Sequence, residues 1–433
     1  MKRAVFLLAL VILLFTSSSA HAQDFIITSY DINTKFSGKP AAVDVSLTCN
    51  FNVNNNLNGM QFIFGSECIL RDASYINGGG RTEIPYKFDG KDSLMLTTGG
   101  NFLPGNDYSL KFNYSFPAGT FNDTILILDR GHRWYPLIMD QIVPYKLTSE
   151  VPNGFSVLSA GDLVETNRGS EKSVFVWESK MPVFKIPLIV INTNAFKKTS
   201  NDICDFFYLG IDSMQADGIL NETGKILKYF ENNLGAYPHK KLTLCEVKDF
   251  PGINTGSGLL TVGFQTLEYM AKGYTDMLIL TIAQQWFGAG VFAKYGDKGF
   301  SFLNISLPNF LELMYIRSER GDDAYNDQLK NLREEYWKIK DGQYDLPVID
   351  VDFPNTMEKG KILYAKGPLL LSRLEKELGR DNWLSLLKDI YNSFRGKILT
   401  YNNFIEFIAK YDDSGRAQKL MNRLMNNKGW TNE

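Results

Sequence analysis

The chain has 433 residues, of which 44% are hydrophobic and 22% charged, so it can bury a sizeable core without metals or disulfides. Its 46 lysines and arginines nearly balance its 48 aspartates and glutamates. This balance excludes a global electric field that would favour nucleic acid or an anionic membrane as a partner. The length predicts two or three domains.

The first residues have the pattern of an export signal, which we assign to residues 1–22. Two basic residues precede a short apolar run, Ala4–Phe15, and an A-x-A cleavage site ends at Ala22. An uncleaved membrane anchor is the alternative, but the apolar run is too short to span a bilayer comfortably. We therefore predict cleavage near Ala22 and a periplasmic or secreted protein without a transmembrane segment in the mature chain.

Alternating patterns dominate the first half. Apolar and polar residues alternate along Val43–Val53 and again along Tyr108–Phe116, which is typical of strands with one buried face. Asp89-Gly90 between two apolar segments predicts a hairpin turn. Residues 23–197 are therefore expected to form an antiparallel β saddle or sandwich domain.

The chain has four cysteines, Cys49, Cys68, Cys204 and Cys245. Export permits disulfides, and four thiols allow three full pairings, among which the sequence does not choose. Cys49 lies on the apolar face of an expected strand, so a buried free thiol is an equal alternative there.

A polar stretch at residues 197–202, predicted to be weakly structured, marks the boundary to a second, mostly helical domain at 198–433. Asn221-Glu222 predicts the start of one helix and Gly235 its end, and another helix is expected from Thr275 to Gly288. Later helices are expected at 368–378, 381–394, 401–410 and 416–426. The fold class is thus α+β.

A run of four residues, Gln285-Trp286-Phe287-Gly288, closes an apolar helix. It resembles the end of the zinc helix in the aminopeptidase N family of zinc metallopeptidases (gluzincin group), which reads H-E-x-x-H-Q-W-F-G. Further segments resemble family segments in the right order: Arg133–Pro136 in the β half, Leu234–Leu242, Phe250–Leu259 in place of G-A-M-E-N-W-G-L, and Ile362–Gly367 with its Y-x-K-G. The resemblance implies a β saddle followed by a thermolysin-like domain, without the long C-terminal helical domain of large members.

The same resemblance implies where a catalytic zinc site would lie, and the residues there are degenerate. The two histidine ligands match Leu280 and Gln284, and the third ligand, a glutamate, matches Ile305. Leucine and isoleucine have no donor atom, and a neutral amide oxygen is a poor zinc ligand. The general base matches Thr281, a hydroxyl that is no base near neutral pH, and the glutamate that binds the substrate's amino group matches Thr255.

One catalytic-type residue is retained, because Tyr364 matches the tyrosine that donates a hydrogen bond to the oxyanion. A half-buried structural tyrosine is the alternative. The mature chain has only His132 and His239, and we interpret His239 as an ordinary surface histidine. Ser257 lies between two glycines but lacks a G-x-S-x-G elbow and an obvious base, and a thiol–imidazole pair of Cys245 with His239 has equally little support.

We therefore expect an exported pseudoenzyme that holds no zinc or other cofactor and has no functional catalytic residue. Its partner is expected to be an extended peptide or an envelope protein, bound along a strand edge of the cleft. The alternative is an active zinc aminopeptidase of the same family with non-standard ligands or with ligands from a second chain. The metal content of the protein separates the two.

Overall fold

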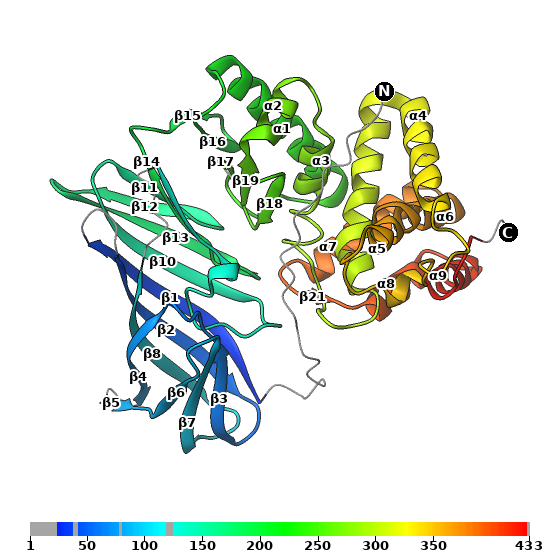
Figure 1. The fold of residues 1–433 in the computed structure, drawn as a ribbon. Coiled ribbons are helices and arrows are strands. Elements are labelled where there is room, and N and C mark those ends of the chain that lie inside the picture. Colours follow the sequence, from blue (N-terminus) through cyan, green and yellow to red (C-terminus); the bar gives the residue numbers. More distant parts are fainter. Residues whose placement is uncertain (1–23, 38–41, 78–79, 118–123, 249, 431–433) are drawn as a thin grey trace.

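The structure is a computed structural model that describes residues 24–37, 42–77, 80–117, 124–248 and 250–430. The predicted export signal and its cleavage site lie outside the described residues. Figure 1 shows a β-rich body formed by the first part of the chain, a smaller sheet that follows it, and a group of helices formed by the last part.

The β-rich body is built around an eight-stranded sheet in the order β12-β13-β10-β1-β2-β8-β4-β5. The alternation predicted in the sequence lies on β2 and β8, whose inward side chains are buried against each other. All pairs are antiparallel except β1 with β10. The strands are β1 Phe25–Ser37, β2 Ala42–Val53, β4 Ile69–Asn77, β5 Gly80–Glu83, β8 Asp107–Pro117, β10 Val143–Pro152, β12 Asp162–Arg168 and β13 Lys172–Val183.

Two three-stranded sheets complete this body. The hairpin predicted at Asp89-Gly90 is confirmed, because it joins β6 to β7 and the Asp89 carboxylate accepts hydrogen bonds from the next backbone N–H groups. The first sheet contains β3 Leu57–Ile63, β6 Tyr86–Phe88 and β7 Ser93–Phe102. The second contains β9 Ile125–Leu128, β11 Phe155–Leu158 and β14 Leu188–Asn192, and the short helix η1 Arg130–His132 follows β9.

A five-stranded sheet in the order β15-β16-β17-β19-β18 begins the second part of the chain. The prediction that residues 197–202 are weakly structured is wrong, because they contain the edge strand β15. The polar side chains of β15 suit an unpaired edge. The strands are β15 Lys197–Ser200, β16 Cys204–Tyr208, β17 Leu242–Val247, β18 Ile253–Gly256 and β19 Leu259–Gly263. Strand β18 is the opposite edge.

Helices pack beside this sheet and form most of the second core. The predicted start of the first helix is wrong: α1 begins at Ser213, where Asp212 caps it. The predicted end at Gly288 is also wrong, because α3 ends at Ala283. The elements are α1 Ser213–Leu234, α2 Phe264–Ala271, α3 Asp276–Ala283, β20 Phe292–Ala293, η2 Phe302–Ser306, α4 Leu307–Trp337, η3 Val348–Asp350, α5 Met357–Lys361, η4 Ile362–Lys366, α6 Gly367–Leu378, α7 Arg380–Phe394, β21 Ile398–Leu399, α8 Tyr401–Lys410 and α9 Arg416–Asn426. No helix in the described part of the chain is long and apolar enough to cross a membrane.

A buried ion pair fastens the last helices together. The Lys366 ammonium lies 3.0 Å from the Asp345 carboxylate, and both side chains are 1% exposed. Asp345 also accepts hydrogen bonds from the Tyr336 hydroxyl at 2.9 Å and from the Gly429 N–H at 3.0 Å. These donors hold the pKa of Asp345 below its usual range despite its burial, so the carboxylate stays charged in the core.

All four cysteines are buried free thiols. Cys49 lies on the inward face of β2, as its alternation pattern predicted, and is 0% exposed. Burial raises the pKa of each thiol. None of the disulfide pairings left open by the sequence is therefore formed, and each cysteine is a separate, protonated core residue.

Candidate functional site

The two glutamines after α3 tie this helix to the edge hairpin of the five-stranded sheet. The Gln284 side-chain oxygen accepts a hydrogen bond of 2.8 Å from the Thr255 hydroxyl on β18. Gln285 is 1% exposed; its oxygen accepts from the Gly258 N–H at 2.9 Å and its amide donates to the Gly256 carbonyl at 3.0 Å. The structure thus brings Gln284 and Thr255 together, and the amide oxygen at one position matched to a zinc ligand already has a partner.

The other α3 positions matched to catalytic roles are Thr281, which is buried, and Leu280. The Thr281 hydroxyl is bound to the carbonyls of Met277 at 2.9 Å and Leu278 at 3.1 Å, which is the usual back-bonding of a threonine inside a helix. Thr281 is 5% exposed, and Leu280 is half-buried. The hydroxyl proton of Thr281 is therefore used by the helix itself.

Two π-helical turns, η2 and η4, carry the remaining positions and pack against each other. Ile305 lies on η2 and packs against the core of the second part of the chain. The turns approach closely because the Ser306 hydroxyl donates to the Leu363 carbonyl at 2.7 Å and Gly367 leaves no side chain between them. Tyr364 lies on η4, is 37% exposed, and has its pKa raised by partial burial of the ring. Single π-helical turns often occur at functional sites.

The side chains at these positions do not fit a zinc ion. Leu280 and Ile305 offer no lone pair, and the oxygen of Gln284 accepts the Thr255 hydroxyl proton. Nowhere in the described ranges do three or more His, Cys, Asp or Glu side chains gather as metal ligands would.

A buried histidine–serine pair lies at the junction of the two parts of the chain. The surface position predicted for His239 is wrong: it is 9% exposed, and its Nε2 lies 2.7 Å from the Ser257 hydroxyl. Burial lowers the pKa of His239 to about 4, with Arg395 acting in the same direction and Asp162 opposing it. The imidazole is thus neutral at pH 7.

The pair has the atoms of a nucleophile and a base, but both side chains are buried and a substrate cannot reach them. Ser257 is 6% exposed, and its carbonyl accepts a hydrogen bond of 2.9 Å from the Gly161 N–H of the β-rich body. A Cβ on Gly258 would lie 3.1 Å from the His239 ring, so the ring packs closely on the backbone next to Ser257. The bond from Gly161 holds the β18–β19 turn against the first part of the chain. Cys245, the other candidate partner of His239, is completely buried and directs its thiol to the Glu246 carbonyl.

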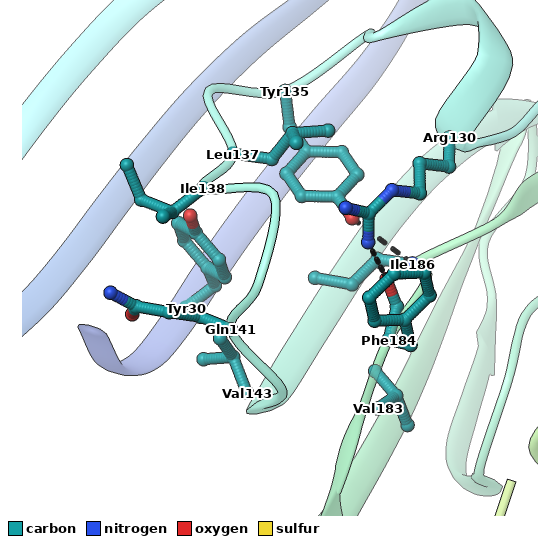
Figure 2. Close-up of a pocket in the computed structure, with 10 residues that line it drawn as sticks. All are labelled: Tyr30, Arg130, Tyr135, Leu137, Ile138, Gln141, Val143, Val183, Phe184 and Ile186. Carbon is teal, nitrogen blue, oxygen red and sulfur yellow. Dashed lines mark hydrogen bonds between the residues drawn. The ribbon is translucent and has the colours of Figure 1, made fainter. Parts of the chain in front are cut away.

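Cationic groups of the β-rich body lie beside β18. The Lys185 ammonium donates to the Asn254 side-chain oxygen on β18 at 3.2 Å, and burial lowers the pKa of Lys185. Figure 2 shows the neighbouring Arg130, whose guanidinium stacks 3.7 Å from the Phe184 ring and donates to the Phe184 carbonyl at 2.6 Å. The cavity there has a volume of about 10 Å³, enough for one water and too small for a ligand. Sequence reasoning missed these cations because nothing local connects residues 130 and 185 to β18.

Comparisons with known proteins find similarity in structure rather than in sequence. No family model matches the chain, and no curated protein matches it. An M1 zinc metallopeptidase from Deinococcus radiodurans superposes with a TM-score of 0.75 at 14% identity over 95% of this chain and 96% of that chain. A mutant of the Deinococcus radiodurans enzyme bound to a Tyr-Ser-Ala substrate gives 0.75 at 14% identity over 94% and 96%.

A two-domain M1 zinc metallopeptidase mutant bound to L-arginine gives a TM-score of 0.75 at 15% identity over 95% of this chain and 96% of that chain. In each case almost the whole of both chains is covered. The likeness shows that this chain has the two-domain fold of these proteins, a large β-rich domain followed by a helical domain, as the sequence predicted.

Proposed function

Starting from the fold of the M1 zinc metallopeptidases, we propose that this protein is an exported, catalytically inactive binding protein for an extended peptide or protein segment. The single observation that carries the proposal is the chemistry at the positions matched to the zinc ligands. Leu280 and Ile305 cannot coordinate an ion, and the side-chain oxygen of Gln284 already accepts a hydrogen bond from Thr255.

Loss of the metal removes most of the catalytic machinery of this fold. The metal generates the nucleophile from bound water, and a carboxylate takes the proton. Thr281 stands where that carboxylate is expected, and its hydroxyl is bound within α3. Tyr364 could still donate a hydrogen bond to an oxyanion, but one such donor does not supply a nucleophile or a base.

Strand β18 supports the peptide-binding part of the proposal. It ends the five-stranded sheet and pairs only with β19 among the described strands, so its other edge offers backbone groups to an added strand. Met277 of α3 is 41% exposed, and its Cε would lie 3.3 Å from a Cβ built on Gly252, just before β18, which places an apolar side chain beside that edge. One of the similar structures holds a Tyr-Ser-Ala substrate, a ligand of the same chemical class.

Metal analysis tests the loss of catalysis. The purified protein is expected to carry substoichiometric zinc and to show no chelator-sensitive turnover of chromogenic amino-acyl amides. The matched control restores the ligand set with Leu280→His, Thr281→Glu, Gln284→His and Ile305→Glu, and this variant is expected to bind about one zinc per chain. Stoichiometric zinc with chelator-sensitive turnover in the unaltered protein would overturn the proposal.

A pair of proline substitutions tests binding along β18. Successive N–H groups of a strand point to opposite sides, so one of Asn254→Pro and Thr255→Pro removes an outward N–H and the other removes a bond to β19. The first kind should weaken peptide binding roughly fivefold, because a net hydrogen bond contributes about 1 kcal/mol; at position 255 the change also removes the hydroxyl bond to Gln284. The second kind should lower stability instead. Peptide-array binding no stronger than that of an unrelated protein would refute the peptide-binding function.

Export is tested separately. The mature protein recovered from the producing cell should begin at Gln23, as N-terminal sequencing would show. A mature chain that keeps residues 1–22 would refute cleavage.

A further inference from the structure

A second cavity, with a volume of about 500 Å³, lies where three sheets meet. Its walls come from β12 and β13 of the large sheet, β11 and β14 of a three-stranded sheet, and β15 to β17 of the five-stranded sheet (Figure 1). None of the described residues that line it belongs to α3, β18, η2 or η4. The cavity is therefore separate from the positions matched to the zinc site.

Aromatic side chains give this cavity an apolar body. Phe175 and Trp177 of β13, Phe196 before β15 and Phe207 of β16 line it. The Trp177 ring is fixed, because its indole N–H donates to the Val157 carbonyl at 2.9 Å. A rigid indole with its polar atom already bonded presents only its apolar surface to a ligand.

Charged side chains give the cavity a positive rim. Asp205 is neutralised by the ammonium groups of Lys198 and Lys241, each at 3.0 Å. Asp162 accepts the backbone N–H of Lys240 at 2.7 Å. The side chains of Arg168 and Lys240 are exposed, and the structure gives neither an ion pair with any described residue. The lining thus carries more positive than negative charge, and two of its cations are available to a ligand.

From this combination we propose that the cavity binds a small amphipathic acid, with its anionic headgroup attracted by the unpaired cations Arg168 and Lys240, which lie toward the two ends of β12, and an aromatic or short alkyl body packed against Trp177. Its volume lies in the range of about 300–1,000 Å³ that accommodates small organic ligands. Charge complementarity selects the anion, since a cation would face the unpaired ammonium and guanidinium groups. This ligand site is independent of the proposed peptide-binding function.

A matched pair of fluorescent probes tests the site. The dye 8-anilinonaphthalene-1-sulfonate has an aromatic body and one anionic group, and N-phenyl-1-naphthylamine has the same body without the charge. The folded full-length protein should bind the anionic dye with one-to-one stoichiometry and at least about tenfold more tightly than the neutral one, because only the anion is attracted by the unpaired cations of the lining.

The double variant Arg168→Glu, Lys240→Glu should bind the anionic dye at least about tenfold more weakly, and its affinity for the neutral dye should be almost unchanged. Both residues are exposed, so the variant should keep its circular dichroism and melting temperature. The control variant Lys376→Glu with Lys388→Glu makes the same charge change on exposed positions of α6 and α7 and should bind both dyes normally.

Equal affinity for the two dyes, or an unchanged affinity of the Arg168→Glu, Lys240→Glu variant, would overturn the proposal. So would a crystal of the complex with the dye seated along the edge of β12 or β18 rather than against Trp177. The proline variants at Asn254 and Thr255 should bind the dye normally, so failure of the peptide-binding function and failure of this site are separate results.

Discussion

The pKa values of the two described histidines should be shifted in opposite directions, and the shift at His239 is the larger one to test. Its folded-state pKa is lowered from 6.5 to about 4 because the ring is buried against Ser257. The pKa of His132 is raised instead, because the ring binds the Asp129 carboxylate at 2.9 Å. The chain has three histidines in all, and the third, His21, lies in the predicted export signal, so the two imidazole signals are easily assigned.

The lowered pKa makes stability depend on pH with a definite sign. Between pH 6.5 and about 4 the unfolded chain binds a proton at His239 and the folded chain does not, so stability falls as the pH falls through this window. The difference between the two pKa values corresponds to about 3 kcal/mol, since each pKa unit equals about 1.4 kcal/mol. Outside the window this residue adds no further pH dependence.

Imidazole NMR titration measures both pKa values directly, and urea unfolding from pH 7 to pH 4 measures the stability. In His239→Gln the side chain can still reach Ser257 but does not titrate, so about 3 kcal/mol of the loss on acidification should disappear relative to the unaltered protein. Carboxylates that do not interact with His239 titrate equally in both proteins and cancel in the comparison. A His239 pKa near 6.5, or identical pH dependence in both proteins, would refute the reasoning.

Three further predictions concern packing. Lys366→Met leaves the buried Asp345 charge unpaired and should lower the free energy of unfolding by about 3–5 kcal/mol in urea, whereas Lys376→Met on the surface should change it by less than about 0.5 kcal/mol. Gly367→Ala places a Cβ 2.0 Å from the Ser306 hydroxyl and should cost roughly 1–3 kcal/mol; an unchanged or raised melting temperature would contradict the close approach of η2 and η4. The four thiols should react with a thiol reagent only after denaturant is added, and rapid labelling of the native protein would contradict their burial.

Local patterns predicted the elements whose burial is periodic. The alternation along β2 and β8, the Asp89-Gly90 turn and the helices α6 to α9 were found close to their predicted places. The start of α1 was missed although Asp212 and Gln215 form a capping box. The first turns of α1 are mostly polar, so the helical spacing of apolar residues becomes clear only further along the helix. The long helix α4 was not predicted, since its second half is largely polar and Gly321 interrupts it.

The site was harder to predict, because its contacts join segments that are distant along the chain. The family resemblance named Gln284 and Thr255 as separate matched positions, and only the packing of α3 on β18 shows that they bind each other. His239 and Ser257 are brought together by the parallel pairing of β17 with β19, which no local pattern encodes. The π-helical turns at η2 and η4 likewise depend on tertiary contacts.

The state of the sulfur atoms has a consequence for how the protein is made. Four buried thiols, none bonded to another, offer no disulfide that an oxidant or an isomerase would have to form or rearrange in the native state. Folding therefore need not wait for covalent closure, and the same conformation should be reached in a reducing cytosol and in an oxidising environment outside it. Recombinant production would need no reshuffling step.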